Sequence, residues 1–155
     1  MPPRFALGLD YGTTSVRALV VSIEDGREIG TALAPYPHGR DGVLTDPADP
    51  HLARQHPEDY RASLERAVTE ALAKAREDEE FAPERIIGIG VDATASTPLP
   101  VDERLVPLAS HPDLASRPEA WAWLWKDHTA HAEAEEITAL LRRESPEHLD
   151  RLGGT

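Results

Sequence analysis

The chain has 155 residues, which suits one domain, with 28 acidic against 16 basic residues and a formal net charge of −12. This balance argues against nucleic-acid binding and against binding to an anionic membrane, because both need a basic surface. No cysteine is present, so disulfides, thiolate metal sites and a cysteine nucleophile are excluded. Because there is no long apolar run and no signal-peptide pattern, we expect a cytoplasmic protein.

The first stretch, residues 5–22, consists of two apolar runs joined by a short turn, which predicts a β-hairpin. The first run ends in Asp10, which is placed to hold a hydrated Mg²⁺. The turn is open to close approach at its glycine and rich in N–H and O–H donors, so it can cradle an anion such as phosphate. Its residues are Gly12, Thr13, Thr14 and Ser15. The alternative is a plain hairpin turn without a ligand.

The next segments predict the rest of an antiparallel meander and then a helix. An Asp-Gly turn at residues 24–27 leads into a third strand over Glu28–Tyr36. Residues 35–55 are polar and broken by prolines, which predicts a long loop whose histidines, His38, His51 and His56, are solvated rather than metal ligands. Residues 57–76 carry apolar side chains at three- and four-residue spacing, which predicts a helix packed on the sheet.

A second acid-tipped loop follows the helix. The continuous apolar run over residues 85–91 predicts a strand buried on both faces, and it leads into Asp92 and a loop of small and hydroxyl residues. Ligands of open α/β sheets bind beyond the carboxyl ends of strands, so Asp10 and Asp92 are expected to face one cleft. A helix-capping or turn cluster is an equally good interpretation of the second loop. Residues 99–101 predict a short further strand.

The aromatic residues gather near the end of the chain, in a predicted loop that carries Trp121, Trp123 and Trp125. Most of this aromatic mass is expected in the core. The sequence Trp125-Lys126-Asp127-His128, however, combines an aromatic face with a cation and a carboxylate, which suits a polyol. A metal at His128 and His131 is disfavoured, since no further ligand has the proper spacing. Residues 130–143 predict an amphipathic helix.

Three motifs in this order resemble a known family. They are Leu-Gly-Leu-Asp-Tyr-Gly-Thr-Thr-Ser-Val-Arg over residues 7–17, Ile-Gly-Ile-Gly-Val-Asp over 87–92 and Leu-Trp-Lys-Asp-His-Thr-Ala over 124–130. The chain resembles the FGGY family of carbohydrate kinases over essentially its whole length, and among them the kinases that act on L-ribulose. The resemblance implies an α/β chain with the actin-like ATPase, ribonuclease-H-like fold. The first lobe would have a mixed sheet that opens with an antiparallel hairpin meander and is flanked by helices.

The resemblance also implies the chemistry and its residues. Transfer of the γ-phosphoryl group of ATP to the terminal hydroxyl of L-ribulose, a step of L-arabinose breakdown, would need ATP and Mg²⁺. By the family motifs, Asp10 would position Mg²⁺ and the turn at residues 12–15 would line the phosphates. Ala95 and Ser96 would border the sugar, and Trp125 and Lys126 would contact it.

Members of this family are several times longer than the chain, so residues 1–155 are expected to be the N-terminal portion of the first domain. No catalytic residue is assigned, because the family's general base lies downstream, and the chain alone is expected to be inactive. Alternatives are another pentulose or polyol kinase of the family, or a non-catalytic remnant that binds sugar or phosphate. A second copy in a homodimer, or a separately encoded second half, would be its protein partner.

Overall fold

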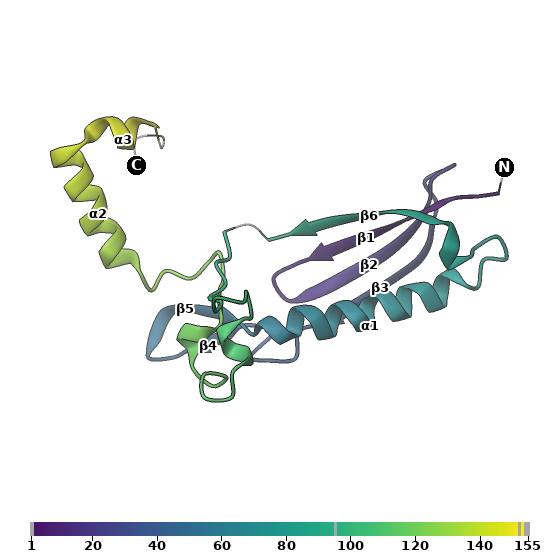
Figure 1. The fold of residues 1–155 in the computed structure, drawn as a ribbon, viewed down its shortest axis with the longest axis horizontal. Coiled ribbons are helices and arrows are strands. Elements are labelled where there is room, and N and C mark those ends of the chain that lie inside the picture. Colours follow the sequence, from purple (N-terminus) through teal and green to yellow (C-terminus); the bar gives the residue numbers. More distant parts are fainter. Residues whose placement is uncertain (1, 95, 152, 154–155) are drawn as a thin grey trace.

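The computed structural model describes residues 2–94, 96–151 and 153 and shows two sheets with one long helix. Figure 1 shows the elements, which follow one another as β1 (Phe5–Tyr11), β2 (Ser15–Ser22), β3 (Glu28–Pro35), β4 (Leu44–Asp46), β5 (Asp49–Gln55), α1 (Pro57–Ala75), β6 (Ile86–Ala93), β7 (Ala122–Trp123), α2 (His131–Glu144) and α3 (Pro146–Arg151). The chain is thus mixed α/β. None of the helices among these residues is long and apolar enough to cross a membrane.

The larger sheet has the strand order β3-β2-β1-β6. Strands β1, β2 and β3 are antiparallel neighbours, whereas β6 pairs with β1 in parallel. A parallel partner needs a crossover connection, and α1 provides it between β3 and β6. Because the crossover returns β6 alongside β1, the carboxyl ends of these two strands meet at one edge of the sheet.

Helix α1 packs on β2 and β3 through small side chains. Ala67, Ala71 and Ala75 are fully buried at four-residue spacing, so they lie on one face of the helix. Gly30 of β3 lies against this face, where a β-carbon would overlap the Ala71 carbonyl oxygen and lie 2.8 Å from the Ala75 nitrogen. The glycine therefore lets the helix approach the strand closely. The predicted helix with its apolar stripe is confirmed, and it begins at Pro57 as expected.

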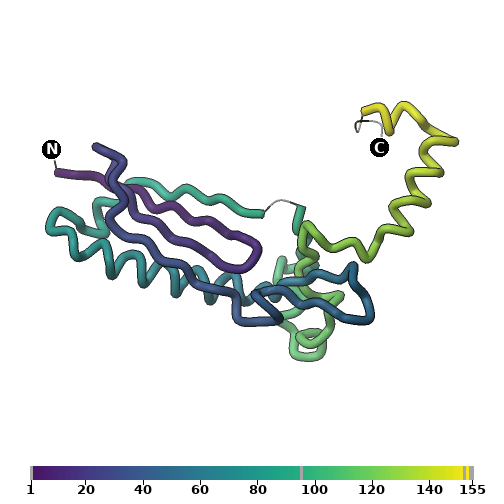
Figure 2. The backbone as a smooth tube through the Cα atoms, turned by 180° about the vertical axis from the view of Figure 1, so that it is seen from behind, coloured from purple at the N-terminus to yellow at the C-terminus, as the bar shows by residue number. Residues whose placement is uncertain are grey.

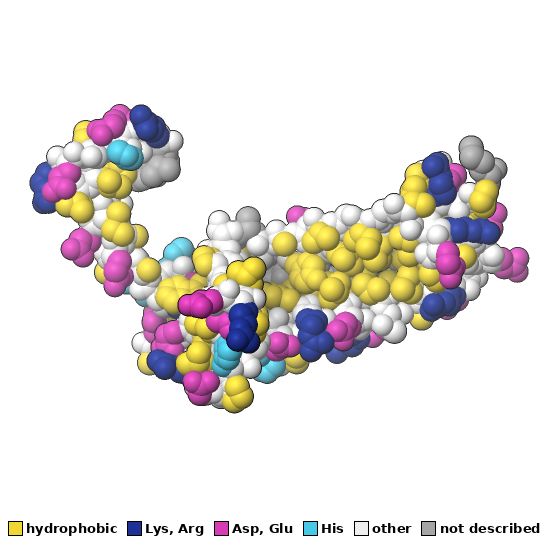
Figure 3. Space-filling view, in the orientation of Figure 1, with side chains coloured by type: hydrophobic (Ala, Val, Ile, Leu, Met, Phe, Trp, Pro, Cys, Tyr) yellow, Lys and Arg dark blue, Asp and Glu magenta, His cyan; other side chains and the backbone are white. Residues whose placement is uncertain are grey.

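Strand β6 is not buried on both faces, so that prediction is wrong. Its side chains are largely exposed, and Ile89 and Val91 are each 65% exposed. The reason is that α1 covers β2 and β3 but does not extend over β6, which is the edge strand of the described sheet. Figure 3 shows the resulting cluster of hydrophobic side chains beside the helix. Seen from behind (Figure 2), no described helix crosses the opposite face of the sheet.

Residues 35–55 are not one long loop, so the prediction of a loop over this range is wrong. They contain β4 and β5, which form an antiparallel hairpin, and β5 also pairs with β7 to complete a three-stranded sheet. The pairing of Arg54 with Trp123 joins segments far apart in the sequence. The short strand expected over residues 99–101 is reduced to an isolated bridge between Val101 and Pro107.

Of the helices that the structure describes, α1 flanks the larger sheet, whereas α2 and α3 do not. Helix α2 has no buried residue, and its contacts are chiefly with α3. Figure 1 shows both helices projecting from the two sheets. The predicted amphipathic helix is therefore present, but its apolar residues Ile137 and Leu140 are exposed.

Candidate functional site

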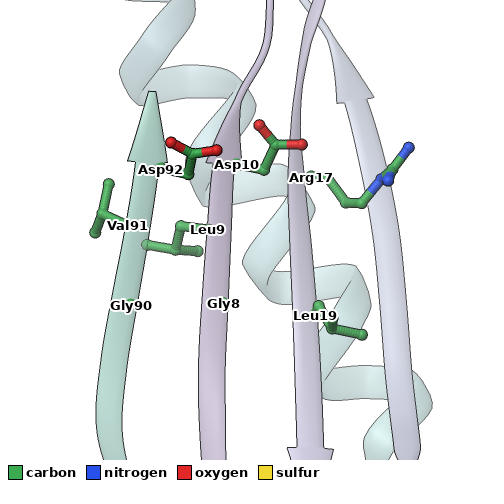
Figure 4. Close-up of a pocket in the computed structure, with 8 residues that line it drawn as sticks. All are labelled: Gly8, Leu9, Asp10, Arg17, Leu19, Gly90, Val91 and Asp92. Carbon is green, nitrogen blue, oxygen red and sulfur yellow. The ribbon is translucent and has the colours of Figure 1, made fainter. Parts of the chain in front are cut away.

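Two carboxylates lie side by side where β1 and β6 end. The parallel register pairs Asp10 with Asp92, and Figure 4 shows both carboxylates at the same edge of the sheet. They border an open cavity of about 450 Å³, and Gly8 and Gly90 lie one strand repeat below them. The structure thus brings together the two acids that the sequence placed at strand ends.

Gly12 opens the turn between β1 and β2. Its N–H donates to the Ser15 carbonyl oxygen at 3.0 Å, which closes the turn. A β-carbon at Gly12 would lie 3.4 Å from that same oxygen, so the chain itself has room for a side chain here. Glycine instead leaves this space open to close approach by a ligand.

The two central residues of the turn, Thr13 and Thr14, are held in place by hydrogen bonds to their carbonyl groups. The Thr13 carbonyl accepts a hydrogen bond from the Gln55 side chain at 2.6 Å, and the Thr14 carbonyl accepts one from the Tyr36 N–H at 2.9 Å. No residue that the structure describes accepts a bond from the N–H of Thr13 or Thr14. Anchored carbonyls with free N–H groups give a preorganised set of donors for an anion.

Arg17 is a cavity residue that the sequence motifs did not single out for a role. It lies directly opposite Asp10 in the hairpin register and lines the same cavity. In Figure 4 its side chain extends toward β3, away from the two acids. The signal was present in the sequence, because a hairpin closed around residues 12–15 places residue 17 across from residue 10.

Trp125 reaches this turn from a segment more than a hundred residues away. Its indole N–H donates to the Thr13 hydroxyl at 3.3 Å, and the side chain is 54% exposed. Lys126 is exposed beside it. Ser96 is also exposed, in a left-handed backbone conformation with φ 57°, whereas Ala95 lies outside the described residues. An exposed indole face thus stands next to the proposed phosphate turn.

Asp127 does not face a polyol, which corrects that part of the prediction. Its side chain is 4% exposed, and its carboxylate lies 3.3 Å from the Nε of Arg54, which is equally buried. The same carboxylate accepts bonds from the Ala53 N–H at 2.8 Å and the Thr129 hydroxyl at 2.6 Å. The Arg54 guanidinium also stacks on the Trp123 ring. This network fixes the segment that carries Trp125 and Lys126.

The ionised state of Asp127 follows from these contacts. Burial alone would raise the pKa of its carboxyl group, but the bonds from Ala53 and Thr129 and the charge of Arg54 outweigh burial, so the pKa is lowered. Burial in turn lowers the pKa of Arg54, against the opposing effect of Asp127. At neutral pH the two groups are therefore a buried ion pair.

The histidines of residues 35–56, which the sequence analysis expected to be solvated, make specific contacts in the structure. His56 is buried, not solvated, and its ring accepts a bond from the Glu58 N–H at 3.3 Å as the N-cap of α1. Burial lowers the pKa of His56, and the neighbouring His38 lowers it further. His51 packs against His131 with ring centroids 4.7 Å apart. The expectation that these histidines are merely solvated is wrong for His56.

Comparison with known proteins identifies relatives of the chain. A ribulokinase of Shouchella clausii is 40% identical over 155 residues, which is 97% of this chain, and one of Geobacillus thermodenitrificans is 40% identical over 99% of it. This chain is a relative of the ribulokinases. The resemblance drawn from its three motifs is thereby confirmed. No protein-family model matches it.

The ribulokinase relatives extend beyond what this chain covers, since it spans 27% of the length of each. Among solved structures, a xyloylose kinase from Brucella ovis matches 92% of the chain with a TM-score of 0.65 at 24% identity. That likeness concerns the fold and covers 25% of the solved chain. The sequence comparison therefore relates the chain to the ribulokinases, and the structural comparison shows that it shares the fold of part of the solved kinase.

Proposed function

We propose that this chain supplies the first part of the cleft of an L-ribulose kinase, with ATP as the phosphoryl donor. The observation that carries the proposal is the bond between the Trp125 indole and the Thr13 hydroxyl. It joins the residue expected to touch the sugar to a residue expected to touch the phosphates. Similarity to ribulokinases supports the choice of sugar. On this proposal the larger sheet and α1 belong to the first lobe of an actin-like, ribonuclease-H-like fold.

The turn at residues 12–15 is proposed to bind the phosphates. The free N–H groups of Thr13 and Thr14 and the hydroxyl side chains around them are donors suited to anionic oxygens. The Arg17 guanidinium, which lines the neighbouring cavity, adds positive charge. Asp10 and Asp92 fit Mg²⁺, because this ion is held by one or two carboxylates and several waters. Bound there, Mg²⁺ would neutralise charge on the phosphates during transfer.

The sugar is proposed to lie against Trp125. Its indole face would cover the C–H groups of the pentulose, while Lys126 and the backbone near Ser96 would contact its hydroxyls. The terminal hydroxyl attacks the γ-phosphorus, ADP leaves, and a base takes the hydroxyl proton. Asp127 is not that base, since its carboxylate forms an ion pair with Arg54 and accepts hydrogen bonds from Ala53 and Thr129.

Calorimetry with the purified protein tests this function. Mg²⁺-ATP and L-ribulose are titrated separately into the unmodified protein and into Asp10→Asn and Trp125→Ala. We expect Asp10→Asn to weaken the binding of Mg²⁺-ATP and Trp125→Ala to weaken that of L-ribulose, each by about tenfold or more. Asp113→Asn, which removes an exposed carboxylate elsewhere, is the matched control and should change neither.

Two further measurements separate the alternatives. Titration with D-xylulose and ribitol identifies another sugar preference if either binds more tightly than L-ribulose. ADP release with Mg²⁺-ATP and L-ribulose reports whether this chain also supplies a base. Absence of both nucleotide and sugar binding, or binding that both variants leave unchanged, would overturn the proposal.

A further inference from the structure

Two histidines and one aspartate meet at the start of α1, apart from the phosphate turn. One ligand atom from each of His38, His56 and Asp59 lies within 4.8 Å of the others. The cluster joins the segment after β3, which carries His38, to the N-terminus of α1, where His56 is the N-cap and Asp59 lies in the first turn. None of the three belongs to the motifs that indicate a kinase.

Asp59 is a buried carboxylate whose contacts come mainly from one histidine. Its side chain is 2% exposed, and its two oxygens contact the Nδ1 and the backbone N–H of His38, at 2.5 Å and 3.0 Å. No lysine or arginine among the residues described pairs with it. A buried carboxylate without a fixed cationic partner favours a cation beside it.

The two rings are held in place by their surroundings. They stack with centroids 4.2 Å apart, and the Trp121 ring packs edge-on against His56 and His38 at 4.6 Å and 5.8 Å. His38 precedes a tightly built turn, in which Arg40 and Val43 exchange both backbone hydrogen bonds. Its side chain is 48% exposed, which leaves a path from solvent to the cluster.

We propose that His38, His56 and Asp59 form a binding site for a divalent transition-metal ion such as Zn²⁺. Two imidazole nitrogens and one carboxylate oxygen are ligands that Zn²⁺ prefers, and a water entering past His38 completes a tetrahedral set. Mg²⁺ is not the occupant, because it prefers oxygen ligands, which Asp10 and Asp92 provide instead.

Binding requires a small rearrangement of the cluster. Ligands about 2 Å from a tetrahedral ion lie roughly 3.3 Å apart. His38 Nδ1 and the Asp59 oxygen, now 2.5 Å apart, would therefore separate by just under ~1 Å to admit the ion, and the His56 ligand atom, which lies within 4.8 Å of both, would adjust to the same spacing. The exposed His38 ring can turn to do this. His56 gives up only the 3.3 Å bond from the Glu58 N–H. A bound ion would then tie the segment after β3 to the N-terminus of α1.

The test is titration of the full chain with Zn²⁺ by calorimetry, and with Co²⁺ by visible absorption, which reports tetrahedral coordination. We expect one equivalent to bind and to raise the melting temperature. His38→Ala and Asp59→Asn should each weaken Zn²⁺ binding by about tenfold or more. His56→Asn should do the same while keeping a residue that can cap α1.

The chain offers a matched control in its second pair of adjacent rings, His51 and His131, which packs without a carboxylate ligand. His51→Ala should leave the affinity for Zn²⁺ unchanged. The proposal is overturned if the unmodified protein binds no stoichiometric Zn²⁺, or if the three cluster variants bind it as tightly as His51→Ala does. The kinase proposal is independent of this result, because Mg²⁺-ATP binding is measured separately.

Discussion

The indole N–H of Trp125 donates to the Thr13 hydroxyl at 3.3 Å, across 112 residues of sequence. Thr13 and Trp125 are each held in place by a different set of contacts. The Thr13 carbonyl is bound by Gln55, and Trp125 precedes a segment anchored by the buried pair of Arg54 and Asp127. Both anchors come from consecutive residues of β5, so this strand sets the distance between the proposed phosphate turn and the proposed sugar face.

Substitutions at Trp125 should separate its two contributions. Trp125→Phe keeps an aromatic face but removes the bond to Thr13, which is partly exposed to solvent, so we expect a few-fold loss of L-ribulose affinity at most. Trp125→Ala removes the face as well and should cost about tenfold or more. Titration calorimetry measures both. Equal losses in the two variants would mean that the hydrogen bond, rather than the face, holds the sugar.

Trp125 should contribute little to the free energy of unfolding, in contrast to the nearby Trp121. Trp121 is 8% exposed and packs on His56, so Trp121→Ala should lower the free energy of unfolding by about 3–5 kcal/mol. Trp125→Ala, at a half-exposed position, should change it by less than about 1 kcal/mol. Urea unfolding followed by circular dichroism compares the two, and a large loss for Trp125→Ala would contradict its assignment as a surface contact.

Breaking the buried pair should be costly. Asp127→Asn leaves the Arg54 charge buried without its counter-charge, and we expect a loss of about 3–5 kcal/mol in the free energy of unfolding. The control is Glu65→Gln, which breaks the exposed pair with Arg61 and should cost less than about 1 kcal/mol. Similar losses for the two variants would show that burial of the Arg54 pair has no energetic consequence.

Asp127 should also give the protein an acid-sensitive contribution to stability. Its folded-state pKa is lowered below the unfolded value of about 3.9, so its contribution is complete above that value. The contribution is lost as pH falls through the folded pKa. Unfolding measured from pH 6 down to pH 2 should therefore show a steeper loss for the unmodified protein than for Asp127→Asn, and parallel curves would exclude this role.

Close approach of α1 to the sheet should make Gly30 intolerant of substitution. Gly30→Ala places a β-carbon against the backbone of α1, so strand and helix must separate, and we expect a loss of about 1–3 kcal/mol or more. Gly88→Ala is the control, since a β-carbon there meets nothing within 4 Å. Thermal unfolding of both variants tests the difference, and equal stability would mean that the helix shifts without cost.

The sequence predicted those elements whose evidence is local. The apolar spacing of residues 57–76 and the turn after Asp10 needed no distant partner, and both appear where expected. Strands β4 and β5 were missed because their polar, proline-broken sequence resembles a loop. Their sheet is completed by β7, which lies almost seventy residues later. Such pairings leave no periodic signal.

The residues of the candidate site also fall into those that the sequence predicted and those that it did not. Asp10 and Asp92 were predictable from the ends of two apolar runs, because parallel strands bring their carboxyl ends together. The burial of Asp127 was not, since it depends on Arg54, a residue far away in a segment expected to be loop. The apolar run of β6 predicted a strand buried on both faces, but side-chain composition alone does not show whether another element packs against each face.

Gln55 should prove to be the support of the phosphate turn. Its amide donates to the Thr13 carbonyl at 2.6 Å and its oxygen accepts from the Tyr60 hydroxyl at 2.7 Å, with the side chain 1% exposed. Gln55→Glu keeps the acceptor but replaces the donor by a carboxylate facing a carbonyl. We expect a loss of about 1–3 kcal/mol in the free energy of unfolding and weaker Mg²⁺-ATP binding.

Tyr60→Phe provides the comparison that isolates the turn. It removes the bond at the other end of Gln55 but leaves the donor to Thr13 in place, so it should lower stability while changing nucleotide affinity much less. Burial and the nearby Asp59 raise the pKa of Tyr60 to about 12, so its hydroxyl remains a donor throughout the neutral range. If Tyr60→Phe weakened nucleotide binding as much as Gln55→Glu, the effect would come from general loosening of β5 rather than from the Thr13 carbonyl.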